Sequence, residues 1–423
     1  MREKCIFHID VNSAFLSWSA VKRLKDDPDS VDLRTIPSAV AGDVETRHGI
    51  ITAKSIPAKK FGVVTAEPVF KALEKCPNLV LVKSDFKTYR EYSAGFIGIL
   101  RKYSEKLQQV SIDEAFLDLT GTRYAEDPVV SANIIKNDIK DSLGFTVNIG
   151  ISENKLLAKM ASDFEKPDKV HTLYPEEIEK KMWGLPIGEL FGCGKRTSEK
   201  LKKIGIHTIG DAAKTDADIL IPLLGEKAGT YIFESANGIG DDEVISEERE
   251  AKSYSNESTT VVDIDETNFA EEGMKIVHEL SESVAKRMQR DGVYASTIEA
   301  IVKTSEFKRR SHQRKLIDST NSAAVIEANA ELLFEEMLMG EKGLFRQGQK
   351  LRLIGVGASN LDKREFHQMS LLDMLQGNEI VMPEEMERSY EKAEKDKKLR
   401  NMMDKINQKF GKGFISKGVT KSQ

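Results

Sequence analysis

The stretch SIDEAFLD at residues 111–118 alternates apolar and polar residues, as a strand does, and carries adjacent carboxylates at Asp113 and Glu114. A second run, HID at 8–10, ends an apolar segment on a third carboxylate, Asp10. Acidic side chains gathered in a sheet repel one another unless metal ions neutralise them. Hard divalent ions such as Mg²⁺ take carboxylate oxygens as ligands, so these three residues are candidates for a metal site.

A site shared by Asp113 and Glu114 requires an irregular backbone, because adjacent residues on a regular strand point to opposite faces. We therefore expect the chain to turn or bulge at this point. Two ions about 3.5–4 Å apart can activate an attacking hydroxyl and stabilise a leaving pyrophosphate. The alternative is that Asp-Glu simply marks an ordinary hairpin turn. Residue chemistry alone leaves both interpretations open.

The composition is typical of an ordinary soluble protein of several domains. The chain has 423 residues, of which 40% are hydrophobic and 31% charged. The net charge of −5 argues against a non-specific nucleic-acid coat protein, although one face can still grip nucleic acid. No window approaches the roughly 20 apolar residues that span a bilayer. Three dispersed cysteines indicate neither disulfides nor a metal motif, so we expect a cytoplasmic protein without a membrane partner.

The order of predicted elements indicates an α+β multidomain fold. Strands alternate with helices from residue 67 to 164, including a helix over 88–106 and a strand over 110–119. Short helices with glycine hinges follow over 174–240, and an acidic segment over 240–250 reads as a linker. From residue 258 the pattern is βαββαβ, which is typical of a split βαβ arrangement.

Several motifs in one order resemble the Y family of translesion DNA polymerases. SIDEAFLD resembles the family signature, and HIDVNSAF at 8–15 resembles its first metal motif. IPAKKFGV at 56–63 is similar to its fingers motif, and NIGISENKLLAKMASDFEKPD at 148–168 is similar to its palm-to-thumb run. LIGVGASNL at 353–361 resembles the closing strand of its little finger. The resemblance covers most of the chain.

The resemblance implies a right-hand polymerase with an added little-finger domain. Its parts would be a palm (residues 1–11 and 76–170), small fingers (12–75), a helical thumb with a helix-hairpin-helix (171–240), a linker (241–256), a βαββαβ little finger (257–363) and a tail (364–423). The implied activity is template-directed transfer from a dNTP to a primer 3′-hydroxyl, with low fidelity and tolerance of damaged templates.

The same resemblance implies roles for individual residues. The ligands of two Mg²⁺ ions, with Mn²⁺ as an alternative, would be the catalytic residues Asp10, Asp113 and Glu114 together with the backbone carbonyl of Val11. Phe15 would be a steric gate against the sugar 2′-hydroxyl, and a core aromatic on the first turn of a helix is the alternative.

Two lysines correspond to cations that the family places on the incoming triphosphate, namely Lys59 and Lys166. The sequence departs here from the commonest pattern, in which a Tyr stands at Ile56 and an Arg at Lys59. Ile56 donates no hydrogen bond, and Lys59 binds as a point charge rather than as a bidentate fork. The outline of the nucleotide pocket is therefore expected, but its detailed contacts are in doubt. An exposed helix face is the alternative for Lys59.

Two further segments are candidates for contact with primer-template DNA. FGCGK at 191–195 resembles a helix-hairpin-helix whose backbone N–H groups approach a phosphate, and an ordinary helix-helix turn is the alternative. Basic residues over 308–315, if they face one way, could track a phosphate backbone, whereas a charged hairpin that blunts a sheet edge is the alternative. The candidate residues are Gly192, Gly194, Lys195, Arg309, Arg310 and Arg314.

The peptide QMSLL at 368–372 is similar to glutamine-led peptides that dock on the DNA polymerase sliding clamp. Its contact residues would be Gln368, Leu371 and Leu372, and an amphipathic turn over the little finger is the alternative. We expect a monomer that recruits the clamp. A rival interpretation is a non-catalytic Y-family scaffold, but that predicts loss of the metal carboxylates. A palm-fold nucleotidyl cyclase would leave the thumb and little finger unexplained.

Overall fold

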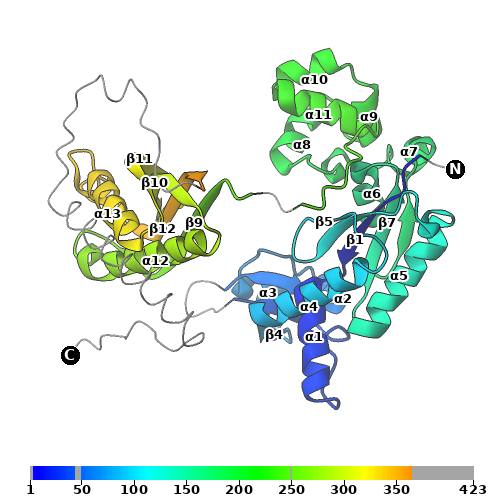
Figure 1. Ribbon diagram of the computed structural model, residues 1–423, viewed down its shortest axis with the longest axis horizontal. Coiled ribbons are helices and arrows are strands. Elements are labelled where there is room, and N and C mark those ends of the chain that lie inside the picture. Colours follow the sequence, from blue (N-terminus) through cyan, green and yellow to red (C-terminus); the bar gives the residue numbers. More distant parts are fainter. Residues whose placement is uncertain (1–2, 43–48, 248–249, 364–423) are drawn as a thin grey trace, which may run out of the picture. The chain divides into compact units, whose positions relative to one another are not determined.

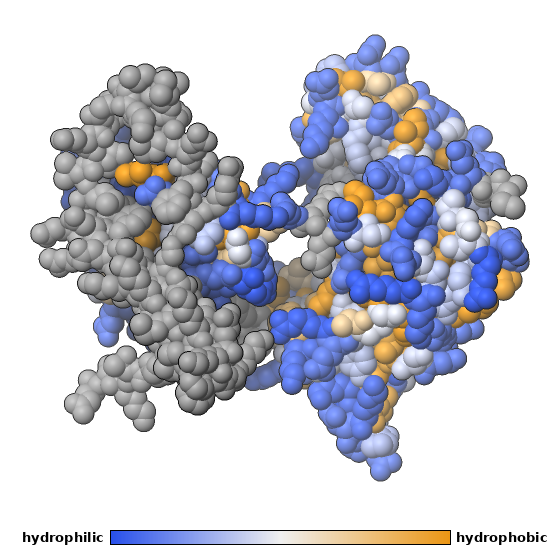
Figure 2. Space-filling model, in the orientation of Figure 1, coloured by the Kyte–Doolittle hydropathy of each residue, from blue (hydrophilic) through white to orange (hydrophobic). Residues whose placement is uncertain are grey.

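A computed structural model describes residues 3–42, 49–247 and 250–363. These residues form two compact units, the first ending at residue 247 and the second beginning at residue 250. Within them, no helix combines the length and the apolar character that crossing a membrane requires. Hydrophilic side chains cover much of the described surface in Figure 2, with apolar side chains between them.

The first unit is built on a five-stranded sheet in the order β5-β6-β1-β7-β8. Strand β1 lies at its centre and pairs antiparallel with both β6 and β7, while β8 runs parallel to β7. The strands are β1 (Ile6–Val11), β5 (Leu107–Gln109), β6 (Glu114–Asp118), β7 (Val147–Ser152) and β8 (Val170–Thr172).

Alternation along β1 separates apolar from polar side chains. Phe7, Ile9 and Val11 are buried in the main core. On the opposite face, His8 and Asp10 approach the residues of helix α6. The core face is covered by α1 (Ala14–Asp26), α4 (Phe86–Leu100) and α5 (Pro128–Leu143), whereas α6 (Lys155–Ser162) packs against the polar face of β1 and β7. The sheet therefore carries its titratable side chains on the α6 side.

Local signals in the sequence fix the helices that frame this sheet. The side chain of Asp127 accepts a hydrogen bond from the N–H of Val130 at the start of α5, and Gly144, with φ 79°, ends it. Helix α6 begins in the same way, because Asn154 accepts from the N–H of Leu157. Each such cap contributes about 1 kcal/mol.

Two smaller bodies complete the first unit (Figure 1). A three-stranded sheet in the order β3-β2-β4 packs with two short helices. Its elements are β2 (Ser38–Ala41), β3 (Ile51–Lys54), α2 (Ile56–Lys60), α3 (Val69–Lys75) and β4 (Val80–Lys83). A helical cluster shares its core with α6 and contains α7 (Ile178–Lys181), α8 (Lys195–Lys202), α9 (Ile209–Lys214), α10 (Ala217–Leu224) and α11 (Glu226–Ala236).

The second unit has the predicted βαββαβ order and the sheet order β11-β10-β12-β9. All neighbouring strands are antiparallel, so each helix joins two parallel strands with one strand between them. The expected split βαβ arrangement is confirmed. The elements are β9 (Ser253–Ile264), α12 (Met274–Arg290), β10 (Tyr294–Thr304), β11 (Arg309–Thr320), α13 (Ala323–Met339) and β12 (Leu351–Asp362).

Three predicted boundaries differ from the structure. The helix predicted over 88–106 is α4, which ends at Leu100 because the chain turns back there into β5. The strand predicted over 110–119 begins only at Glu114, since residues 110–113 form a hairpin. Residues 253–256, expected in the linker, pair with β12 as part of β9.

Candidate active site

The three predicted carboxylates come from two neighbouring strands and one hairpin. Asp10 near the end of β1 is the register partner of Glu114 at the start of β6. Asp113 precedes Glu114 in the hairpin between β5 and β6, and its carbonyl accepts a hydrogen bond from the N–H of Val11 at 3.0 Å. Antiparallel pairing therefore brings segments that are about a hundred residues apart in the sequence to the same end of two neighbouring strands.

The hairpin at 110–113 provides the turn that the sequence required. The N–H groups of Val110 and Ser111 both donate to the carbonyl of Glu114. The hydroxyl of Ser111 then donates to Oδ1 of Asp113 at 2.6 Å, which holds that carboxylate. Asp113 therefore lies in a hairpin turn, as the alternative interpretation required, and the same turn brings its carboxylate to the candidate site.

Two lysines lie against the carboxylates of β1 and β6. Nζ of Lys159 is 2.7 Å from Oε1 of Glu114 and 3.5 Å from Oδ2 of Asp10. Nζ of Lys166 is 2.7 Å from Oδ1 of Asp10. Both lysines also approach Asp163, at 3.5 and 3.0 Å. The result is a continuous network in which acidic and basic groups alternate.

His8 of β1 also belongs to this network. Its Nδ1 lies 2.8 Å from the hydroxyl of Ser162, and its Nε2 lies 3.8 Å from Oε2 of Glu114. Burial lowers the pKa of His8, so the ring is neutral near pH 7. It therefore contributes polarity to the site, and the formal positive charge comes from the lysines.

The electrostatics of the two strand carboxylates differ. Burial raises the pKa of Asp10 to about 6, against the opposing effect of Lys166. The pKa of Glu114 is lowered, first by its interaction with His8 and then by hydrogen bonding with Asp10 and Lys159, although burial opposes this shift. Burial also acts to lower the pKa of Lys159, but its carboxylate partners outweigh burial and raise it. Pairing between carboxylates and lysines therefore allows ionised groups to lie in the interior.

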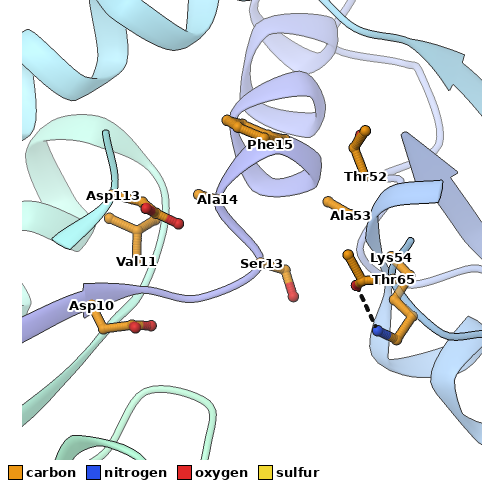
Figure 3. A pocket seen from close by; sticks show the side chains of 10 residues that line it. All are labelled: Asp10, Val11, Ser13, Ala14, Phe15, Thr52, Ala53, Lys54, Thr65 and Asp113. Atoms are coloured by element: carbon orange, nitrogen blue, oxygen red, sulfur yellow. Dashed lines mark hydrogen bonds between the residues drawn. The ribbon is translucent and has the colours of Figure 1, made fainter. Parts of the chain in front are cut away.

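A cavity of about 250 Å³ opens beside Asp10 and Asp113. Figure 3 shows these two carboxylates on one side of it and Lys54 with Thr65 on the other. Phe15 forms part of its wall. The cavity is lined by Asp10, Val11, Ser13, Ala14, Phe15, Thr52, Ala53, Lys54, Thr65 and Asp113.

Phe15 lies at the first turn of α1 with its ring packed on a buried aromatic group. It stacks on Tyr89, with ring centres 4.7 Å apart and planes inclined by 17°. Phe86 meets it edge-on at 6.2 Å. Phe15 therefore packs on the core, and it also lines the cavity.

The donor atoms at this site suit hard divalent cations. Carboxylate oxygens from Asp10, Asp113 and Glu114 are the ligands that Mg²⁺ and Mn²⁺ prefer. The lysine ammonium groups already occupy part of this negative environment, and no group of three acidic, histidine or cysteine residues among the described residues is gathered as a metal site. The residue types fit a divalent ion, and the carboxylates of Asp10 and Glu114 also contact lysine side chains.

Lys59 does not line the cavity; it is exposed on α2. A lysine that the sequence reasoning missed, Lys54 at the end of β3, lines it instead. Its Nζ donates to Oγ1 of Thr65 at 3.0 Å, and burial lowers its pKa. Alternation from Thr52 along β3 could have pointed to Lys54, but nothing in the sequence places β3 opposite Asp113.

The glycines at 191–195 form the predicted turn. Gly192 has φ 82°, and a Cβ there would lie 2.5 Å from the ring of Tyr231. Gly194 caps the N-terminus of α8, and the side chain of Lys195 is 90% exposed. The turn is therefore open to a ligand at its lysine and packed against Tyr231 at its first glycine.

The condition that the basic residues of β11 face one way is not met by the three candidate arginines. Arg309 pairs with Glu257 of β9 at 2.6 Å. Arg314 instead pairs with Glu336 of α13, on the face that carries the buried Leu316. Because successive residues alternate, Arg310 shares the helix-side face with Arg314. The three arginines are thus divided between two faces.

The clamp peptide, with Gln368, Leu371 and Leu372, lies outside the described residues, as does the rest of the tail from 364.

Comparison with known proteins identifies two family domains in the chain. Residues 9–163 match the impB/mucB/samB family, and residues 251–371 match the C-terminal domain of the same family. Together they cover more than half of the sequence, including both carboxylate segments and the sheet of the second unit.

Curated relatives match almost from end to end. A protein of Clostridium acetobutylicum named DNA polymerase IV is 40% identical over 98% of this chain and 98% of its own length. Bacillus subtilis has a relative named DNA polymerase IV 1 that is 35% identical over 99% of this chain and 94% of its own.

Solved structures show the same fold. A Y-family DNA polymerase chimera of Dbh and Dpo4 matches with a TM-score of 0.68 at 22% identity, covering 84% of this chain and 98% of that one. A Dbh ternary complex matches over the same shares with a TM-score of 0.57.

Proposed function

The chain belongs to the impB/mucB/samB family of Y-family DNA polymerases and is a DNA-directed DNA polymerase, and on this premise we propose that it extends primers at low fidelity past damaged template bases. The observation that carries the proposal is the meeting of Asp10, Asp113 and Phe15 at one cavity, with Glu114 beside Asp10. This cavity is the proposed site of the incoming dNTP.

The reaction joins the primer 3′-hydroxyl to the α-phosphate of the dNTP and releases pyrophosphate. Two divalent ions, Mg²⁺ or Mn²⁺, held by Asp10, Asp113, Glu114 and the Val11 carbonyl would activate the hydroxyl and offset charge on the triphosphate. No protein general base is required, because positioning and electrostatics dominate phosphoryl transfer.

The residues of the chain hold and select the substrates. Phe15, fixed by its stack on Tyr89, is the proposed gate that rejects a 2′-hydroxyl by steric clash. Lys54, Lys59 and Lys166 are proposed to supply positive charge to the triphosphate. Lys54 is supported by its place in the cavity wall, and Lys166 by its contact with Asp10.

We extend the proposal to the domains and partners. The five-stranded sheet would be the palm, the β3-β2-β4 body the fingers, the helical cluster the thumb and the second unit the little finger. Gly192, Gly194 and Lys195 would hold primer-template DNA through its phosphates, with Arg309, Arg310 and Arg314 assisting. The clamp peptide would recruit the sliding clamp to a monomeric, cytoplasmic enzyme. A non-catalytic scaffold gains no support, since all three carboxylates are present.

Primer extension by the purified protein tests the activity. The wild type should extend an annealed primer with dNTPs in a reaction that depends on a divalent ion, and Asp113→Ala should not. Asp141→Ala, which removes an exposed carboxylate of α5 outside the proposed ligand set, is the control and should retain most activity. Absence of metal-dependent extension by the wild type would contradict the proposal.

A further inference from the structure

Lys159 occupies an unusual position for a charged residue. It lies on α6, is only 8% exposed, and its ammonium group reaches the polar face of the central sheet. Lysine is rarely buried unless it is paired. Its partners are the carboxylates of Glu114 at 2.7 Å, Asp10 at 3.5 Å and Asp163 at 3.5 Å. Two of these three are proposed metal ligands.

Without this lysine the two strand carboxylates would face an unfavourable environment. Asp10 and Glu114 are register partners on adjacent antiparallel strands, and backbone pairing fixes their separation. Their side chains are 12% and 25% exposed, so water screens their mutual repulsion only in part. A positive charge between them is therefore a condition for keeping both ionised in this fold.

Lys166 does not duplicate that role. It contacts Asp10 and Asp163, its side chain is 34% exposed, and no contact joins it to Glu114 among the described interactions. Lys159 therefore bridges the two strands. Three carboxylates, Asp10, Glu114 and Asp163, against two ammonium groups leave one net negative charge. Such a network favours the approach of a cation even while the lysines are in place.

We propose that Lys159 is a positioning residue that holds the Asp10 and Glu114 carboxylates together in the metal-free protein and competes with divalent ions for them. The inference rests on the proposed function, which makes these carboxylates metal ligands. It goes further, since it assigns a resident counter-ion that keeps the site assembled before metal and nucleotide bind. Divalent ions and Lys159 are then alternative partners of the same oxygens, so removing the lysine should make folding stability depend on metal.

The test is thermal unfolding of the full chain with EDTA and with saturating Mg²⁺. In EDTA, Lys159→Met should lower the apparent Tm of the first unit by about 5 °C, because a buried ion pair is broken and two carboxylates repel. Saturating Mg²⁺ should restore most of that loss and should raise the Tm of the variant more than that of the wild type. Lys159→Arg should stay close to the wild type in EDTA.

Lys136→Met is the matched control. Lys136 has a side chain that is 11% exposed and pairs with Asp168 at 2.7 Å, a carboxylate outside the proposed ligand set. Its variant should lose stability equally in EDTA and in Mg²⁺. Lys159→Gln provides the same comparison as Lys159→Met in a milder form, since it retains a hydrogen-bond donor.

The outcomes separate this inference from the proposed function. If Lys159→Met behaves like Lys136→Met, with a loss that Mg²⁺ does not restore, or shows no loss in EDTA, the positioning role is overturned. If Lys159→Met gives that result and the wild type still extends primers, the positioning role fails but the proposed polymerase activity is retained. Absence of primer extension by the wild type would instead overturn the function on which the inference rests.

Discussion

The carboxylate site of the first unit and the basic strand β11 of the second differ in how far their charged side chains are buried and paired. Around Asp10 and Glu114, charged groups are largely withdrawn from water and each contacts a partner within 3.5 Å. Along β11, Arg309, Arg310 and Lys315 are exposed, and the pairs that occur are at the surface. A buried charge must be paired or neutralised, whereas a surface pair is worth about 0–1 kcal/mol.

The difference indicates how each region can work. Single substitutions in the buried cluster should have large effects, because each one leaves a neighbour uncompensated. Single substitutions on β11 should have small, additive effects, because phosphate contacts there depend on the summed charge. The expected effects therefore decrease from the carboxylates to the exposed strand.

The largest effect is expected at Asp113. Asp113→Asn keeps the shape of the side chain and removes its charge, and it should lower kcat for primer extension at least about 1,000-fold through loss of metal-assisted stabilisation. Far-ultraviolet circular dichroism should be unchanged, because Asp113 lies in a partly exposed hairpin. Single-turnover kinetics measures the loss, and a decrease of less than tenfold would remove Asp113 from the ligand set.

Phe15→Ala should have the next largest effect, on selectivity. Opening the cavity wall removes the clash with a ribose hydroxyl, so the preference for dNTP over rNTP in kcat/KM should fall about 100-fold. Phe86→Ala is the control, since Phe86 is exposed and touches Phe15 only edge-on. Equal losses of selectivity in both variants would show that general packing, and not the gate, sets the preference.

Lys54 and Lys59 give a paired comparison within one segment. Because Lys54 lines the cavity, Lys54→Met should raise KM for dNTP about tenfold. This change corresponds to the loss of one charged contact worth about 1.4 kcal/mol. Lys59→Met should raise KM less than about threefold, because Lys59 is exposed outside the cavity. Steady-state kinetics with a single dNTP distinguishes them, and the reverse order would return the main role to Lys59.

The smallest effects are expected on β11. Arg310→Ala should weaken binding to primer-template DNA about two- to threefold. It should also reduce the slope of the log binding constant against log salt concentration by about one, which corresponds to one phosphate contact. Glu257→Gln should slightly tighten binding, since it releases Arg309 from its ion pair. Fluorescence anisotropy at several salt concentrations tests both. A loss of affinity in Glu257→Gln would mean that the pair itself is required for DNA contact.

The sequence predicted the parts of this molecule that depend on short-range pattern. HID and SIDEAFLD alternate as strands, and the need for a turn at Asp113 followed from strand geometry. The βαββαβ unit followed from the order of apolar periods. The same alternation places the adjacent residues Arg309 and Arg310 on opposite faces, which the sequence analysis had left open.

The rest depended on long-range register. In the helix around KLLAKMAS, Lys159 looks like a solvated lysine, and only the pairing of β1 with β6 and the packing of α6 place it between two carboxylates. Lys54 was missed for the same reason, since its role depends on where the β3-β2-β4 body meets the end of β1. Sequence periodicity specifies the face of an element, and the distance between elements comes from tertiary packing.

Counting bound ions shows whether Asp10, Asp113 and Glu114 hold two divalent ions. Mn²⁺ binding to the full chain with primer-template DNA and a non-hydrolysable dNTP analogue can be followed by electron paramagnetic resonance. We expect two tightly bound ions in the wild type and the loss of at least one in Asp10→Asn, with Lys136→Met retaining both. Two ions bound with unchanged affinity in Asp10→Asn would contradict this expectation.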